Sequence, residues 1–269
     1  GQGEIKEMEK QHSSKQHFSK EHQPTHALFS CNQAIAVVTG AVGQLGQEFS
    51  IALANCGARV VSLDIVDPGS SPILRPEFQR LREEGKIRHW NCDITRRPEL
   101  ERVLREVQST WGTPTVLINN AALDSPPSAP ASENGPFETY PEASLSKILD
   151  VNLKGAFFCC QVFGGAMALA GQGSIVNIAS MYGLISPNQD IYEYKRRAGQ
   201  TWYKPAPYAL TKAGLIQLTR YLATYWARKG VRVNSLSPAG IAAGQDEEFL
   251  KEYQKRMPLG RMAEPSELV

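Results

Sequence analysis

Six short, continuously apolar segments recur between residues 34 and 238, and helical stretches separate them. The segments read AIAVVTG, ARVVSLDI, IRHWNCDI, TVLINNAA, GSIVNIAS and VRVNSLSP. Strands that are apolar throughout are typical of a parallel sheet covered on both faces. In RPELERVLREVQSTW, apolar residues recur at three- and four-residue intervals, which indicates an amphipathic helix. The alternation predicts a single α/β domain with a doubly wound parallel sheet and right-handed crossovers.

Residues 1–33 are polar and of mixed charge, and we expect them to form a flexible extension before a domain at 34–269. The extension holds four of the five histidines, at spacings that share no helical face, so no metal site is expected. A net charge of +2 gives no reason to expect nucleic acid. No apolar run approaches a membrane span, and five cysteines without a CxxC pair favour reduced thiols in a cytoplasmic protein.

The stretch VVTGAVGQLGQEF joins the first strand to the first helix and carries glycines at 40, 43 and 46. Glycines at this turn let the backbone approach a ligand, and the helix N-terminus behind them attracts a pyrophosphate. Asp64 ends the second strand, where a carboxylate accepts the ribose hydroxyls of adenosine and repels a 2′-phosphate. No basic residue flanks Asp64. We therefore expect a Rossmann-type site that prefers NAD over NADP.

Five tyrosines lie between residues 182 and 208, and a lysine at the fourth following position distinguishes one of them. A free tyrosine titrates near ~10, so a neighbouring cation is needed to make it a base at neutral pH. Only Tyr208 is followed four residues later by a lysine, Lys212, at the start of an amphipathic stretch. The spacing places both side chains on one helical face. Tyr208 is the predicted acid/base catalyst.

Several motifs in order resemble the short-chain dehydrogenase/reductases: TGAVGQLG, CDIT, NNAA, VNLKG, NIAS, YALTK and VNSLSPAGI. The resemblance runs from about residue 34 to the end of the chain. It implies that Asp93 binds the adenine edge, that Asn119 and Ala121 line the cofactor groove, and that Ile241 meets the nicotinamide. The implied cofactor contacts are Gly40, Gly43, Gln44, Leu45, Gly46, Asp64, Asp93, Ile94, Asn119, Ala121, Tyr208, Lys212, Pro238, Gly240 and Ile241.

For the chemistry, the resemblance implies the set Asn152, Ser180, Tyr208 and Lys212. Ser180 would hydrogen-bond the substrate oxygen, Lys212 would also hold the nicotinamide ribose, and Asn152 would hold a proton-relay water. The sequence departs from the family pattern at Gln44, Ala122 and Ala239, where glycine is usual. Family members also continue into one more strand, so we expect a C-terminally truncated domain. They commonly pair through the helices after the fourth and fifth strands, here about 145–170 and 208–229, which implies a homodimer or homotetramer.

Between Ser180 and Tyr208 stand more residues than the family usually has, and we expect this insert, about 187–206, to cover the site. Its Tyr192, Glu193, Arg196 and Arg197, with Ser180, are the candidate substrate contacts for a sugar-like or phosphorylated small molecule. The loop 123–145 would form the opposite rim. A weaker resemblance points to bacterial surface-sugar pathways, those of nonulosonic acids and flagellin glycans. Two alternatives remain: a catalytically impaired NAD-binding protein, and an epimerase or dehydratase that uses NAD transiently.

Overall fold

All six apolar segments form strands of one parallel sheet in the computed structural model, which describes residues 30–124 and 131–269. The strands are β1 (Ile35–Thr39), β2 (Arg59–Asp64), β3 (Ile87–Asn91), β4 (Val116–Asn119), β5 (Gly173–Ile178) and β6 (Val231–Leu236). Their spatial order is β3-β2-β1-β4-β5-β6. The predicted doubly wound fold is therefore confirmed. The predicted extension lies outside the described residues except for its last four positions.

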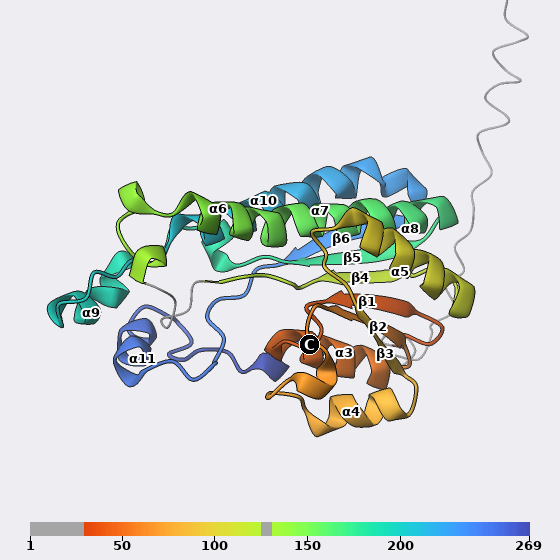
Figure 1. Ribbon diagram of the computed structural model, residues 1–269, viewed down its shortest axis with the longest axis horizontal. Coiled ribbons are helices and arrows are strands. Elements are labelled where there is room, and N and C mark those ends of the chain that lie inside the picture. The colour runs from red at the N-terminus through yellow and green to blue at the C-terminus, as the bar shows by residue number, and fades with distance from the viewer. Residues whose placement is uncertain (1–29, 125–130) are drawn as a thin grey trace, which may run out of the picture. The chain divides into compact units, whose positions relative to one another are not determined.

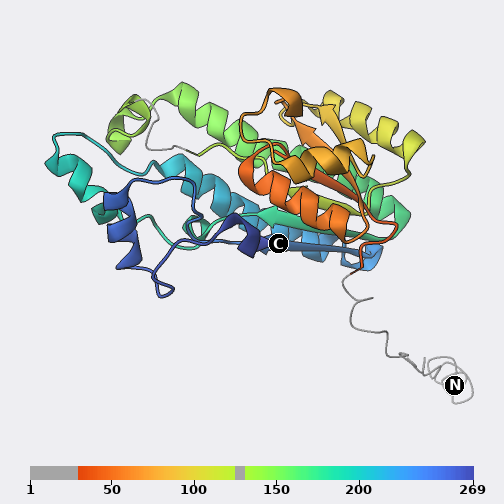
Figure 2. The same cartoon turned by 90° about the horizontal axis from the view of Figure 1, so that it is seen from below.

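Helices cover both faces of the sheet (Figures 1 and 2). One face carries α3 (Gln44–Asn55) and α4 (Pro76–Glu83), and its core includes Phe49, Phe78 and Leu81. The other face carries α5 (Arg97–Thr110), the helical segment of α6, α7 and α8, and α10 (Ala206–Tyr225). Its core includes Leu100, Phe163 and Leu222. Buried apolar side chains on both faces explain why the strands are apolar at every position.

The segment Glu142–Ala170 is one long helical run with two widened turns. It comprises α6 (Glu142–Leu149), α7 (Ala156–Cys159) and α8 (Gly165–Ala170), joined by π-helical turns at Asp150–Gly155 and Cys160–Gly164. By length and composition alone this run is apolar enough to cross a membrane. The expectation that no apolar run approaches a membrane span did not allow for it. Cys159, Phe163 and Met167 are fully buried in the core of the domain. We therefore interpret it as a core helix.

The strand order reverses between β1 and β4, whose neighbours lie on opposite sides. In an open parallel sheet such a reversal opens a crevice at the carboxyl ends of the strands, where ligands bind. The glycine loop follows β1, the NNAA motif follows β4, and Ser180 follows β5. The topology thus brings motifs that are far apart in sequence to one edge of the sheet.

The insert before α10 folds against the C-terminal part of the chain. It contains a short turn at Gln189–Tyr192 and helix α9 (Glu193–Arg197), and it approaches α11 (Glu247–Gln254) (Figure 1). Tyr192 stacks against Trp202 and Phe249, with ring centroids 3.9 and 5.7 Å away. The Tyr194 hydroxyl donates a hydrogen bond of 2.8 Å to Asp246 Oδ2. The insert is therefore a packed wall with its own small aromatic core.

Candidate active site

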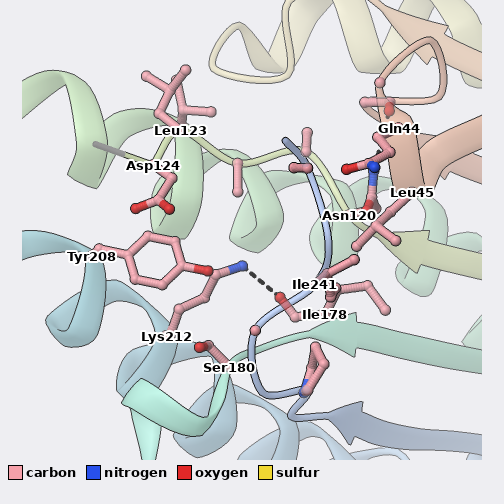
Figure 3. Close-up of a pocket in the computed structure, with 18 of the residues that line it drawn as sticks. Gln44, Leu45, Asn120, Leu123, Asp124, Ile178, Ser180, Tyr208, Lys212 and Ile241 are labelled. Carbon is pink, nitrogen blue, oxygen red and sulfur yellow. Dashed lines mark hydrogen bonds between the residues drawn. The ribbon is translucent and has the colours of Figure 1, made fainter. Parts of the chain in front are cut away.

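A cavity of about 950 Å³ runs along the carboxyl ends of the strands. Figure 3 shows Tyr208, Lys212 and Ser180 toward one end, and Gln44, Leu45 and Asn120 toward the other. Of the predicted site residues, those that line it are Gly40, Gly43, Gln44, Leu45, Asp64, Asp93, Ile94, Ala121, Ser180, Tyr192, Tyr208, Lys212, Pro238, Gly240 and Ile241. The cavity therefore joins the predicted nucleotide end to the predicted chemical end.

The glycine loop approaches its neighbours too closely for side chains. Gly40 has φ +61°, and a Cβ there would lie 2.8 Å from the Cα of Ala121. A Cβ on Gly46 would lie only 2.0 Å from the carbonyl oxygen of Gly40, so Gly46 allows α3 to pack against the end of β1. Gly43 lines the cavity itself. The loop leaves the N-terminus of α3 open to the cavity, which suits the phosphates of a dinucleotide.

Gln44, a departure from the family pattern, links the two ends of the domain. Its Nε2 donates a hydrogen bond of 2.8 Å to the carbonyl oxygen of Ala242, beyond β6. The Gly240 amide in that segment donates to the Tyr253 hydroxyl at 2.6 Å. These contacts hold the Pro238–Ile241 segment beside the glycine loop. The amide side chain thus performs a positioning task that glycine could not.

Two aspartates mark the nucleotide end. Asp64 accepts hydrogen bonds of 3.0 Å from the amides of Val42 and Val66. Asp93 accepts from the amide and hydroxyl of Thr95, at 2.9 and 2.7 Å. Both side chains are therefore held in place by the backbone turns that follow their strands, and both line the cavity.

The first asparagine of the NNAA motif does not line the cavity, contrary to the expectation for Asn119. Its side chain is buried, and its Nδ2 donates to Asn177 Oδ1 at 2.8 Å, while Asn177 donates to Thr219. It therefore ties β4 to β5 and α10. The next residue, Asn120, takes the cavity position, and its Nδ2 donates to the carbonyls of Thr39 and Gly40. Successive strand residues point to opposite faces, which is why the neighbour fits.

Tyr208 and Lys212 lie one turn apart at the start of α10. Lys212 Nζ is 5.5 Å from the Tyr208 ring centroid and donates a 2.6 Å hydrogen bond to the carbonyl of Ile178. Burial lowers the pKa of Lys212 to about 8, with Asp124 acting in the opposite direction. Burial, and then the charge of Asp124, raises the pKa of Tyr208, while a hydrogen bond with Ser180 lowers it. Lys212 and Ser180 therefore both lie beside Tyr208 at the wall of the cavity.

Asn152 lies in the first π-helical turn, fully buried and outside the cavity lining. Its Oδ1 accepts from the Leu123 amide at 2.7 Å, and its Nδ2 donates to the Leu123 carbonyl at 2.8 Å. It also donates to Thr211 Oγ1 at 3.3 Å. The side chain therefore fixes the chain just after β4 relative to α10. Its amide atoms bond the backbone of Leu123 and the hydroxyl of Thr211, and its expected role in holding a relay water stays a prediction.

At the substrate end the structure separates the predicted residues. Tyr192 lines the cavity, but Glu193, Arg196 and Arg197 do not. Arg196 instead donates to Glu193 and to the carbonyls of Gln189 and Trp202, which closes the insert on itself. The charged groups of Glu193 and Arg196 therefore stabilise the fold of the insert and do not line the cavity.

Three residues that were not among the predicted site residues line the cavity at this end: Asp124, Trp202 and Lys204, the last of which lies in the predicted insert. Lys204 Nζ lies 2.5 Å from Asp124 Oδ1 and 5.0 Å from the Tyr208 ring centroid. A signal was present, because Lys204 stands four residues before Tyr208 as Lys212 stands four after it. Within residues 30–124 and 131–269, no group of three or more His, Cys, Asp or Glu could hold a metal ion.

Comparisons with known proteins identify the family of the chain. Residues 40–269 match a family model described as enoyl-(acyl carrier protein) reductase. A short-chain dehydrogenase from Leptospira borgpetersenii, solved with NAD⁺ bound, is 32% identical with a TM-score of 0.73, over 88% of this chain and 83% of that one. A gluconate 5-dehydrogenase from Burkholderia cenocepacia, solved with NADP and tartrate, is 26% identical with a TM-score of 0.73, over 89% and 86%.

Among curated proteins, the D-arabinitol 2-dehydrogenase (ribulose-forming) of Candida tropicalis is 29% identical, over 90% of this chain and 84% of its own length. The family match covers most of the chain and includes every motif from the glycine loop onward. The chain belongs to the short-chain dehydrogenase/reductase family of oxidoreductases.

Proposed function

We propose that this protein is an NAD-dependent oxidoreductase that interconverts a secondary alcohol and a ketone on a polar, sugar-like or phosphorylated substrate. The observation that carries the proposal is the grouping of Tyr208, Lys212 and Ser180 at one end of a cavity whose other end is a glycine loop. The similarity to a polyol dehydrogenase supports an alcohol bearing several hydroxyl groups.

The residues at the chemical end suit a proton transfer. In the direction of alcohol oxidation, Tyr208 Oη takes the hydroxyl proton of the substrate, and Ser180 Oγ donates a hydrogen bond to the same oxygen. The Lys212 ammonium favours the tyrosinate because an opposite charge stabilises the ionised form. Its buried setting and its bond to Ile178 keep it on the Tyr208 side of the cavity. Asn152 acts indirectly, by holding Leu123 and the chain that follows β4.

The cavity fits a nicotinamide dinucleotide. Bound there, the cofactor accepts or supplies the hydride that complements the proton transfer. Gly40, Gly43 and the N-terminus of α3 would hold its phosphates, and Pro238, Gly240 and Ile241 would line the nicotinamide end. The preference for NAD rests on Asp64, whose charge disfavours a 2′-phosphate. One similar structure contains NAD⁺ and another NADP, so this preference is a proposal about Asp64 in this chain.

Net reduction of NAD⁺ tests the proposal. With a screen of polyols, sugars and sugar phosphates, we expect NADH absorbance to rise in proportion to ketone formed. An epimerase or dehydratase would convert substrate without net NADH. A catalytically impaired binder would show NADH binding by fluorescence but no turnover with any alcohol. The Tyr–Lys–Ser grouping favours the dehydrogenase over the impaired binder, and net NADH formation separates the dehydrogenase from the epimerase or dehydratase.

Subunit association is a further part of the proposal. Apolar side chains are exposed on the long helices that the family resemblance assigns to pairing. On α10, Leu210, Tyr221 and Tyr225 are 58, 59 and 58% exposed, and Phe157 on α7 is 44% exposed. Such side chains on adjacent helices suit a homodimer or homotetramer. Sedimentation analysis tests this, and a cytoplasmic location remains a prediction.

A further inference from the structure

Lys204 and Asp124 form an ion pair beside the catalytic tyrosine. Lys204 Nζ lies 2.5 Å from Asp124 Oδ1 and 5.0 Å from the ring centroid of Tyr208. Lys212 approaches the same ring at 5.5 Å but donates to the backbone of β5. The two lysines therefore have different surroundings, and Lys204 faces the part of the cavity formed by the insert.

The insert holds Lys204 in a fixed position. The Gln189 side chain bonds the Lys204 backbone from both sides: its Oε1 accepts from the amide at 2.9 Å, and its Nε2 donates to the carbonyl at 3.0 Å. The Lys204 side chain is 8% exposed, whereas that of Asp124 is 49% exposed. The lysine is thus built into the wall, and the carboxylate is accessible from the cavity that it lines.

Charge balance at the cavity favours a neutral ligand. At the substrate end the charges of Asp124 and Lys204 cancel each other within their ion pair, while the Lys212 ammonium donates to the Ile178 carbonyl beside the Tyr208 ring. Arg196 is bonded inside the insert. The negative charge of a substrate phosphate or carboxylate beside Tyr208 would be repelled by the Asp124 carboxylate. Lys204 would compensate that repulsion little, because it is already paired with Asp124.

A hydroxyl group suits the same pair. The hydroxyl donates a hydrogen bond to the Asp124 carboxylate and accepts one from the Lys204 ammonium. Both hydrogen bonds are charge-assisted. Tyr182, Tyr192 and Trp202 line the cavity nearby and offer ring faces to the C–H groups of a carbon chain.

We propose that Asp124 and Lys204 are the substrate-recognition pair of this enzyme, which bind hydroxyls next to the reacting carbon. They select neutral polyols and ketoses over the phosphorylated or carboxylated counterparts. The inference rests on the proposed function, because it assigns a substrate class to the Tyr208 site, and it narrows the sugar-like or phosphorylated class to its neutral members.

Matched substrates test the inference on the full chain. With NADH, the ketone pair is D-ribulose and D-ribulose 5-phosphate; with NAD⁺, the alcohols are D-arabinitol, D-gluconate and 2-butanol. We expect kcat/KM for each neutral polyhydroxy compound to exceed that of its charged counterpart by at least about tenfold. Measured on the plateau of each pH profile, Asp124→Asn should raise KM for D-arabinitol by about tenfold or more with little change in kcat, and should change KM for 2-butanol much less.

Further variants separate recognition from stability. Lys204→Met should raise KM for D-arabinitol. Lys204→Arg should leave KM near that of the unmodified protein, because arginine keeps the ion pair with Asp124. Lys251→Met removes a comparable pair on the exposed face of α11 and should change neither parameter. A preference for the phosphate, or an Asp124→Asn effect equal for D-arabinitol and 2-butanol, overturns the inference while the proposed function stands. Absence of turnover with every alcohol overturns the proposed function and the inference together.

Discussion

The nucleotide end of the cavity is shaped by backbone, whereas the substrate end is shaped by side chains that meet across long sequence distances. At the first, Gly40 and Gly46 lie six residues apart and act through the space their missing side chains leave. At the second, Asp124 and Lys204 are 80 residues apart and act through a direct ion pair. A local motif can encode the former, but only chain folding brings together the latter.

The same contrast distinguishes how each end responds to change. A backbone site fails when a new atom intrudes, since close-packed neighbours cannot yield. A side-chain site fails when a charge or hydrogen-bonding group is removed, while the surrounding fold persists. Substitutions at the two ends should therefore separate loss of cofactor binding from loss of chemistry or substrate selection.

The largest expected effect is at the chemical end. Tyr208→Phe removes the proton acceptor but leaves Lys212 and the glycine loop in place. We expect kcat to fall by at least ~10²-fold, the range for losing a general acid/base, with NADH affinity nearly unchanged. Steady-state rates and NADH fluorescence titration measure the two quantities. Tyr221→Phe is the control, because it keeps the ring on the α10 surface proposed for pairing and lies outside the cavity lining. Full activity of Tyr208→Phe would refute the assignment.

A methyl group at the nucleotide end should have the next largest effect. In Gly46→Ala the new Cβ would stand 2.0 Å from the Gly40 carbonyl, so α3 must shift. Overpacking of this kind costs about 1–3 kcal/mol, and we expect a lower midpoint of thermal unfolding together with weakened NADH binding. Gly165→Ala in α8 is the matched control, because nothing lies within 4 Å of its added Cβ. Equal behaviour of the two variants would contradict the close-packing argument.

Cofactor choice should change more modestly. Asp64→Ala removes the charge that disfavours a 2′-phosphate, and it also removes the acceptor for the Val42 amide. We expect the ratio of kcat/KM for NAD⁺ to that for NADP⁺ to fall by about tenfold, mostly through a higher KM for NAD⁺. Asp67→Ala, which removes the cap of a nearby turn, serves as the control. An unchanged ratio in Asp64→Ala would remove this residue from cofactor selection.

The smallest expected effect is a shift in pH dependence. The Asp124 charge raises the pKa values of both Tyr208 and Lys212, so Asp124→Asn should lower both. The rise of kcat/KM with pH, which follows ionisation of Tyr208, should then begin at lower pH, by up to about one unit. Deprotonation of Lys212 should lower kcat/KM at high pH, and in Asp124→Asn this fall should also begin at lower pH. Rate profiles with 2-butanol measure the shift, and movement to higher pH would contradict the assigned sign.

The sequence predicted the fold because the relevant signals are local and periodic. Each strand was recognisable from one apolar segment, and the parallel arrangement followed from continuous apolarity and alternating helices. Tyr208 with Lys212 was recognisable for the same reason, since both lie on one helix. The long helix at 142–170 was expected at about 145–170 from the family resemblance, whereas its two π-helical turns were not expected.

The predictions that need correction depend on which way a side chain points. Asn119 and Asn120 carry the same chemistry, and only the pleat of β4 decides which one faces the cavity. Arg196 appeared to be a ligand contact, but its hydrogen bonds close the insert. In each case the residue type was informative, but the partner was set by packing.

The sequence by itself determined the doubly wound sheet, the glycine turn after its first strand and the tyrosine with a lysine one turn away. These features depend on residues within a few positions of each other, where spacing dictates geometry. The tertiary structure alone decided that Lys204 meets Asp124 beside Tyr208 and that the arginines of the insert turn away. That outcome depends on how the insert packs against α11 and the chain after β4, and contacts between such distant segments leave no periodic trace in the sequence.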